Sequence, residues 1–183
     1  MKTMKVVIPG VLTTVQDLGR FGYQKSGMTC SGVMDTAAYR KGNYLVGNEE
    51  GAAVLEMTLY GGSCRFEEDT VIALTGADMQ PTVNQKPIAM NQAVKVPAGG
   101  VLNLGMAKTG CRTYLAAAGG FEVPKVMGSY STNLKCGIGG HEGRALQMGD
   151  ELPIGEALHS WDEVKDRKVL VPDYPKEVLV SVV

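Results

Sequence analysis

The sequence predicts a mainly β protein, an antiparallel barrel or sandwich with one short helix near residues 35–47. Three observations favour this fold class. Glycine is frequent, with 24 residues among 183, and glycine suits tight turns. The apolar runs are short and are separated by turns that contain Gly, Pro or Asn. A single segment has the spacing and the end signals of a helix.

Eight short apolar runs are the predicted strands. In chain order they cover residues 5–8, 54–58, 63–66, 71–75, 93–96, 101–104, 112–117 and 151–154. Turn signals such as GG at 61–62 and AGG at 98–100 lie between them. Residues 83–88 are predicted to form a hairpin tip, with Asn84 as the residue best able to adopt a positive φ.

The predicted helix covers residues 36–46. Asp35 precedes it as an N-cap whose carboxylate can accept hydrogen bonds from the first turn. Gly47 follows it as a C-terminal stop. Gly42, inside the helix, costs about 1 kcal/mol relative to Ala, which indicates close packing at that position.

The tail has a different character. Residues 161–168 are highly charged and are predicted to be a linker or a short turn. Residues 169–171 and 178–183 are again typical of strands. The sequence stops inside the last apolar run, so we expect that strand to belong to a further part of the protein or to pair with a partner chain.

Composition argues against several functional classes. The chain has 18 basic and 19 acidic side chains, for a net charge of −1, and it lacks the concentrated basic face that nucleic acids or anionic membranes require. The N-terminus lacks the apolar core of a signal peptide, and no apolar run has membrane-spanning length, so we expect a cytoplasmic protein. The cysteines and histidines form no metal-binding pattern, and all four cysteines are predicted to be reduced small hydrophobic residues.

The first candidate site is the polar segment 13–23. Asp17 and Arg20 are its chemically active residues. Arg20 can bind a carboxylate or phosphate through its planar guanidinium. Alternatively, Asp17 and Arg20 pair with each other and brace a turn.

The second group of candidates surrounds the helix. The N-terminus of the helix after 31–35 offers free N–H donors to an anion, although Asp35 itself competes for them as a cap. Asn48 follows the helix. Glu56 lies in a predicted strand, where alternation places it either in solvent or, if both faces are buried, in the interior with a partner.

The richest candidate is the pair of segments 128–133 and 137–144. Ser129, Ser131 and Thr132 supply hydroxyls, the glycines expose backbone, and Arg144 supplies a cation, which together suit an anion or carboxylate. The glycines match neither a Walker A loop nor a dinucleotide fingerprint. His141 is a candidate acid–base group or an exposed bystander, and no catalytic triad is evident.

Eight motifs in order give a further indication. They are TVQDLGRFGYQ (14–24), SGVMD (31–35), NYLVGN (43–48), LEMTLYGG (55–62), ALTGAD (73–78), RTYLAAAGGFEVP (112–124), GSYSTN (128–133) and GGHEGRAL with GDEL (139–152). Together they resemble the KipA-like family, also called allophanate hydrolase subunit 2. Tyr130 stands where that family would be expected to have a smaller or more varied residue.

The resemblance implies a cyclophilin-like β-barrel. The family includes the C component of 5-oxoprolinase, which acts with a KipI-like B component and an A component to open 5-oxo-L-proline to L-glutamate using ATP. Its other members imply two alternatives: a regulatory antagonist of a KipI-like inhibitor, or the carboxyltransferase component of a urea carboxylase/allophanate hydrolase system, which uses biotin on a separate carrier. Family members continue into a second half, so we expect a barrel domain over 1–160, a linker and the start of that half over 161–183, and no activity from this stretch alone.

The resemblance also gives the candidates roles in binding a small-molecule substrate. Asp17, Arg20 and Glu56 are the predicted catalytic residues. The predicted substrate-binding residues are Asp35, Asn48, Ser129, Ser131, Thr132 and Arg144.

Overall fold

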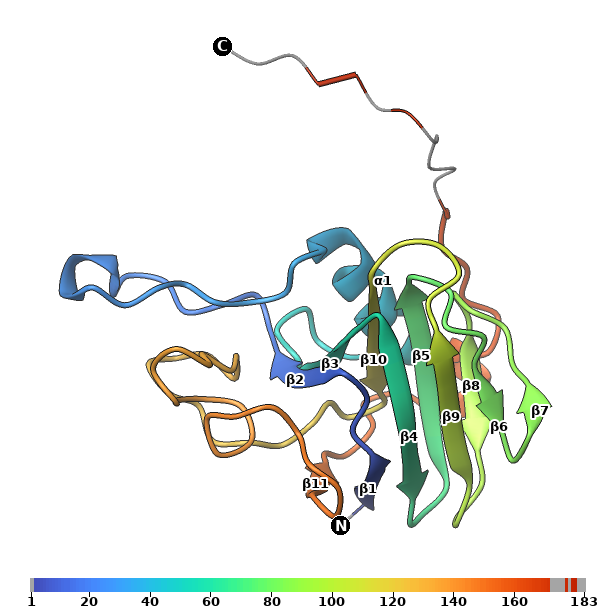
Figure 1. The fold of residues 1–183 in the computed structure, drawn as a ribbon. Helices are drawn as coiled ribbons and strands as arrows, with labels where there is room; N and C mark the ends of the chain where they lie inside the picture. The colour runs from blue at the N-terminus through green and yellow to red at the C-terminus, as the bar shows by residue number, and fades with distance from the viewer. Residues whose placement is uncertain (1, 172–176, 178, 181–183) are drawn as a thin grey trace.

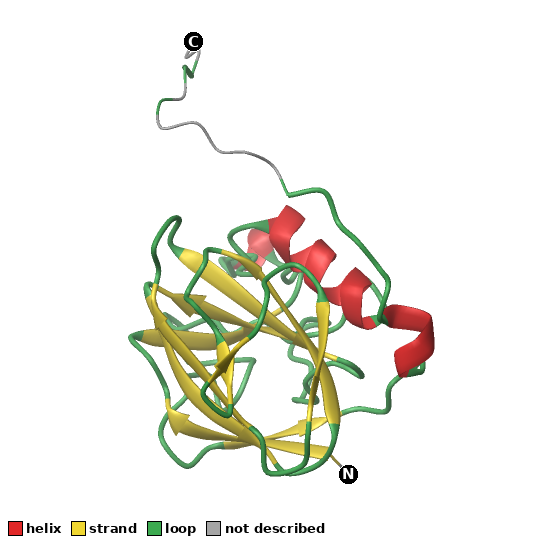
Figure 2. Cartoon of the chain, turned by 90° about the vertical axis from the view of Figure 1, so that its right-hand side faces the viewer, coloured by secondary structure: helices red, strands yellow, loops and turns green. Residues whose placement is uncertain are grey.

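The computed structural model describes residues 2–171, 177, 179 and 180, and shows two antiparallel sheets that curve around a common interior (Figure 1). The first sheet has the order β11 (Glu151–Ile154), β1 (Lys2–Ile8), β4 (Tyr60–Phe66), β9 (Val101–Met106), β6 (Thr82–Val83) and β7 (Lys86–Pro87). The second has the order β2 (Leu12–Gln16), β3 (Val54–Thr58), β10 (Arg112–Ala117), β5 (Thr70–Gly76) and β8 (Ala93–Val96). Figure 2 shows the strands surrounding the interior as a barrel. The predicted mainly β barrel is therefore confirmed.

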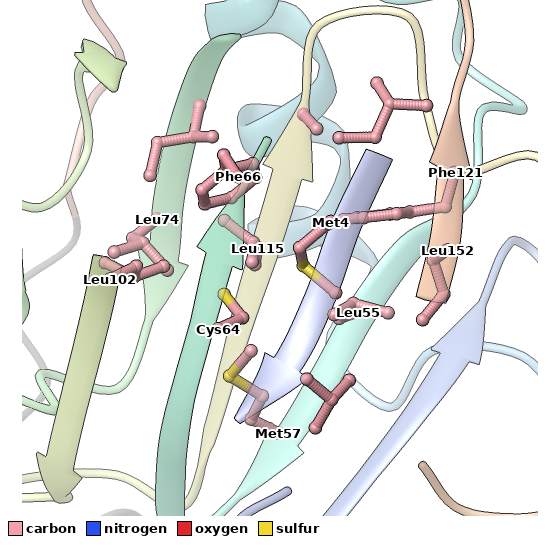
Figure 3. Packing of buried hydrophobic residues seen from close by; sticks show 14 of the residues in the cluster. Met4, Leu55, Met57, Cys64, Phe66, Leu74, Leu102, Leu115, Phe121 and Leu152 are labelled. Atoms are coloured by element: carbon pink, nitrogen blue, oxygen red, sulfur yellow. The ribbon is translucent and has the colours of Figure 1, made fainter. Parts of the chain in front are cut away.

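The core fills the space between the two sheets. Met4, Phe66, Leu102 and Leu115 are fully buried there, and Figure 3 shows them converging from strands of both sheets. Cys64 lies among them, and burial raises the pKa of its thiol to about 12. The described residues contain no disulfide. Cys64 matches the prediction of a buried cysteine, whereas Cys111, in the bend before β10, and Cys136, in a turn, are exposed.

The helix α1 (Thr36–Val46) has the predicted bounds. Asp35 caps it by accepting a hydrogen bond from the Ala38 N–H at 2.9 Å, and Gly47 ends it in a left-handed conformation with φ 75°. The helix lies on the outer face of the second sheet (Figure 2). A Cβ on Gly42 would lie 3.4 Å from the Ala116 Cβ of β10, which confirms close packing at this glycine.

Three predictions need correction, and a fourth lies mostly outside the described residues. The polar segment 13–23 overlaps β2, an unpredicted strand, because its polar side chains are bonded within the protein instead of facing solvent. Thr13 Oγ1 donates to the Pro9 carbonyl oxygen, and Gln16 Nε2 donates to Thr14 Oγ1 and to the Thr132 carbonyl oxygen. Residues 161–164 form a short helix, α2 (Trp161–Val164), which begins with a capping box at Ser160. Residues 169–171 form no strand, and Val169 packs against the cluster around α1. Apart from Leu179 and Val180, which are not in a strand, the predicted strand at 178–183 lies outside the described residues.

The hairpin prediction at 83–88 is confirmed. β6 and β7 pair across it, and both Asn84 and Gln85 have positive φ, at 49° and 67°. Of the helices in the described part of the chain, none has the length and apolar character needed to cross a membrane.

Two long connections project from the same side of the barrel (Figure 1). One joins β2 to α1 and contains the short 3₁₀ helix η1 (Gln24–Ser26). The other joins β10 to β11. Asn133 Nδ2 in the second connection donates to Thr29 Oγ1 in the first at 3.0 Å. Most of the predicted polar segments lie in or beside these two connections, so their mutual contacts decide which side chains can meet a ligand.

Candidate functional site

Asp17, directly after β2, organises the loop at 128–132. Its Oδ1 accepts hydrogen bonds from the hydroxyls of Ser129 at 2.6 Å and Ser131 at 2.5 Å. Its Oδ2 accepts the Tyr130 N–H at 2.7 Å. Asp17 is 6% exposed, and both serines are fully buried. The carboxylate therefore stabilises this loop from inside and does not face solvent.

Arg20 holds the same loop from a second direction. Its Nη2 donates to the Ser131 carbonyl oxygen at 2.6 Å, and its Nε donates to the Val126 carbonyl oxygen at 3.2 Å. Its Nη1 reaches Ser31 Oγ at 3.3 Å. The side chain is almost fully buried, at 1% exposed. Among the described residues Arg20 and Asp17 form no direct ion pair. Both residues instead stabilise the loop at 128–132, to which each donates or from which each accepts hydrogen bonds.

The remaining predicted hydroxyl and amide groups also have internal partners. Thr132 Oγ1 donates to the Val15 carbonyl oxygen at 2.9 Å. Asn48 Nδ2 donates to Asn43 Oδ1 and to the Ala117 carbonyl oxygen, and Asn48 Oδ1 accepts the Gly119 N–H. These side chains fix loops to the barrel.

Arg144 forms a cluster with two carboxylates. Its guanidinium binds Asp150 through both terminal nitrogens, at 2.7 and 2.9 Å, and binds Glu142 at 2.6 Å. The Arg144 hydrogen bonds lower the pKa of Asp150 below its usual range, with a smaller contribution from the Gln147 N–H. His141 Nε2 lies 3.5 Å from Asp150 Oδ1. The guanidinium that was predicted to bind substrate is therefore already occupied by carboxylates.

Glu56 is buried and fully partnered, which decides between its two sequence interpretations. On β3 it accepts a hydrogen bond from Tyr114 Oη at 2.9 Å and from the Met34 N–H at 2.8 Å. Its other oxygen accepts Arg112 Nε at 3.1 Å. Tyr114 Oη in turn accepts the Asp35 N–H at 2.8 Å. Burial, together with the neighbouring carboxylates, raises the pKa of Tyr114.

This network borders a cleft of about 640 Å³. The cleft lies between the start of α1 and the ends of β5 and β10, and its lining includes Met34, Asp35, Ala77, Asp78, Met90 and Arg112. Most of the wall is apolar, with a few polar groups that converge on it, which is the usual character of a small-molecule site. We take this cleft as the candidate functional site.

The structure brings only one predicted substrate-binding residue, Asp35, to the cleft wall, with Glu56 behind it. Sequence reasoning missed Arg112 and Asp78. Both lie inside the motifs RTYLAAAGGFEVP and ALTGAD, and Arg112 directly precedes buried residues of β10. The signal that could have identified Arg112 is a charged residue at the first position of an otherwise apolar strand.

Comparisons with known proteins give consistent relatives. The family described as carboxyltransferase domain, subdomain A and B, matches residues 26–183. The chain is 44% identical to the C component of the Escherichia coli K12 5-oxoprolinase over 168 residues, which cover 92% of this chain and 54% of that protein. It is 37% identical to the urea amidolyase of Saccharomyces cerevisiae over 180 residues, which cover 98% of this chain and 10% of that protein.

A solved structure supports the same fold. The crystal structure of the Kluyveromyces lactis urea carboxylase superposes with a TM-score of 0.83 at 38% identity, covering 94% of this chain and 15% of that one. The chain thus spans about half the length of the 5-oxoprolinase component it matches, and a small part of the urea-converting enzymes.

Proposed function

The chain belongs to the family of carboxyltransferase domains, subdomain A and B, and on that premise we propose that it forms part of the C component of an ATP-dependent 5-oxoprolinase. In this proposal it acts with a KipI-like B component and an A component to convert 5-oxo-L-proline to L-glutamate. One observation supports this choice above others: the 44% identity to the C component of a 5-oxoprolinase extends over 92% of the chain.

The structure suggests how the predicted residues would contribute. The cleft beside Arg112 is open and mostly apolar, so it is the place for a small ring-shaped substrate. Asp17 and Arg20 would keep the loop that contains Ser129 and Ser131 folded, because their polar atoms already hold it, and they would not contact a substrate in the cleft. Glu56 would hold Arg112 in place at the cleft wall.

We assign the ATP to the complex and to no residue of this chain. The glycine-rich loop at 137–143 lines a second hollow of about 420 Å³. The adjacent Arg144 is bound by Asp150 and Glu142, so the surroundings of this loop do not fit a triphosphate, which would be repelled by those carboxylates.

Gene disruption in the source organism tests the proposal. Loss of the gene should cause 5-oxoproline to accumulate, and a plasmid copy of the full-length gene should reverse this. A disrupted strain with unchanged 5-oxoproline would contradict the proposal. Reconstitution with candidate A and B components should then yield glutamate only when ATP and 5-oxo-L-proline are both present.

A second candidate function is supported by the match to the yeast urea amidolyase and the Kluyveromyces lactis urea carboxylase. It is a carboxyltransferase that works with separate biotin-carrying and biotin-carboxylating proteins. The same disruption distinguishes it, because failure to use urea as a nitrogen source, without 5-oxoproline accumulation, would favour this function.

A further inference from the structure

Arg112 is held in the cleft wall with its outer nitrogens available. Its Nε donates to Glu56 Oε1 at 3.1 Å, and its side chain is 25% exposed. The two terminal nitrogens donate no hydrogen bond to any described residue. Because Glu56 is itself fixed by Tyr114 Oη and the Met34 N–H, the guanidinium is oriented before any ligand arrives.

Asp35 provides the complementary acceptor. Its Oδ1 caps α1 by accepting the Ala38 N–H, while its Oδ2 accepts no hydrogen bond within the described part of the chain. Three hydrogen bonds connect the two residues in series, from Arg112 to Glu56, from Tyr114 to Glu56, and from the Asp35 N–H to Tyr114. One buried network therefore positions both a free donor pair and a free acceptor on the same cleft.

The charge at the cleft argues against an anionic recognition group. Glu56 balances Arg112, and Asp35 and Asp78 leave the wall with two further negative charges. A carboxylate placed against this wall would be repelled. A neutral group that both accepts and donates hydrogen bonds would satisfy Arg112 and Asp35 together, while Met34 and Met90 cover its apolar part.

We propose that this cleft binds an amide by its edge, with the terminal N–H groups of Arg112 donating to the carbonyl oxygen and the Asp35 carboxylate accepting from the amide N–H. The guanidinium also polarises the carbonyl that is to react. A lactam and urea share this chemistry. The assignment of the lactam to 5-oxoproline rests on the proposed function, and its carboxylate then points out of the cleft.

Titration of the full chain, followed by ¹H–¹⁵N NMR, tests the inference. The probes are 2-pyrrolidinone, N-methyl-2-pyrrolidinone, which lacks the N–H, and urea below denaturing concentrations. We expect 2-pyrrolidinone to shift the backbone signals of Asp35 and Arg112 at millimolar concentration. The N-methyl compound should bind about tenfold more weakly, the cost of one lost hydrogen bond.

Two variants address the two contacts. Asp35→Asn retains the helix cap, since Asn and Asp cap equally well, but replaces the charged acceptor. Arg112→Met removes the donors and keeps a long apolar side chain. Each should weaken 2-pyrrolidinone binding about tenfold, whereas Arg65→Met, in an exposed ion pair with Glu67, should not change it.

Each outcome bears on the inference. Equal affinity for the methylated and unmethylated lactams, or signal shifts only at the glycine-rich loop, would overturn it. Tighter binding of urea than of the lactam would support the amide site and favour the urea-converting function. If the protein binds the lactam but gene disruption leaves 5-oxoproline unchanged, the amide site stands and the proposed function is rejected. If disruption causes 5-oxoproline to accumulate but the protein does not bind the lactam, the proposed function stands and the amide site is rejected.

Discussion

The Tyr114 phenol lies between the Glu56 carboxylate and the start of α1, donating to Glu56 Oε2 at 2.9 Å and accepting the Asp35 N–H at 2.8 Å. Tyr114 is fully buried. This hydroxyl connects β10 to β3 and to the start of the helix that packs on β10 and β5, so the cleft wall and the outer helix are parts of one hydrogen-bonded unit.

Removing this hydroxyl should destabilise the fold. Tyr114→Phe leaves the Glu56 carboxylate and the Asp35 N–H each without one partner, and we expect the free energy of unfolding to fall by about 1–3 kcal/mol. Urea denaturation measures it. Tyr23→Phe, at a side chain that is 39% exposed, is the matched control and should change stability by less than about 0.5 kcal/mol. Equal effects of the two variants would contradict the role of the buried phenol.

Asp17→Asn tests the braced loop. The amide keeps the size of the side chain but loses charge and one acceptor, so the Ser129 and Ser131 hydroxyls and the Tyr130 N–H are no longer all satisfied. We expect a loss of about 1.5–3 kcal/mol and faster hydrogen exchange in residues 128–132. For comparison, Asp162→Asn alters a carboxylate that is 80% exposed and pairs with Lys165, and it should destabilise the protein much less than Asp17→Asn, because solvent screens an exposed pair. Unchanged exchange in the loop would show that Asp17 does not hold it.

The Asp150–Arg144 pair predicts a pH dependence. The pKa of Asp150 is lowered in the folded state, so its contribution is complete above the unfolded-state pKa of about 3.9 and is lost as the pH falls through the lower folded-state pKa. The stability difference between the wild type and Asp150→Asn should therefore be largest near neutral pH and should shrink below pH of about 4. Denaturation at several pH values measures this difference, with Asp166→Asn at an exposed position as control. A difference that stays constant with pH would show that the carboxylate charge is not the stabilising element.

Two glycines with similar backbone angles separate local strain from steric overlap. Gly62 has φ 72° and Gly99 has φ 74°. A Cβ on Gly62 would overlap the Ile8 carbonyl oxygen where the β1–β4 register shifts, whereas a Cβ on Gly99 would meet no atom within 4 Å. Both Ala variants should lose about 1–2 kcal/mol from the left-handed conformation, and Gly62→Ala should lose more. Thermal unfolding compares them, and equal melting temperatures would mean that β1 can move away from β4.

Local signals in the sequence determined much of this fold. The strands at 54–58, 93–96, 112–117 and 151–154 and the helix at 36–46 have the predicted bounds, because turn residues around short apolar runs, the Asp35 cap and the Gly47 stop act within a few residues. The same reasoning missed β2, since Thr13, Thr14 and Gln16 have the character of surface residues and are buried only in the folded chain, where Gln16 Nε2 donates to the Thr132 carbonyl oxygen.

The site depended on contacts between distant residues. The sequence identified Asp17, Arg20, Arg144 and Glu56 as chemically active. Only the tertiary structure showed that Asp17 and Arg20 are bonded to a loop more than a hundred residues away. It also showed that Arg144 is bonded to the Asp150 carboxylate, a few residues along the chain. It also brought Arg112 to the cleft beside Asp35. The sequence gives the charge and type of each residue. Whether a polar atom is free to bind a ligand depends on the partners that the folded chain brings within hydrogen-bonding distance.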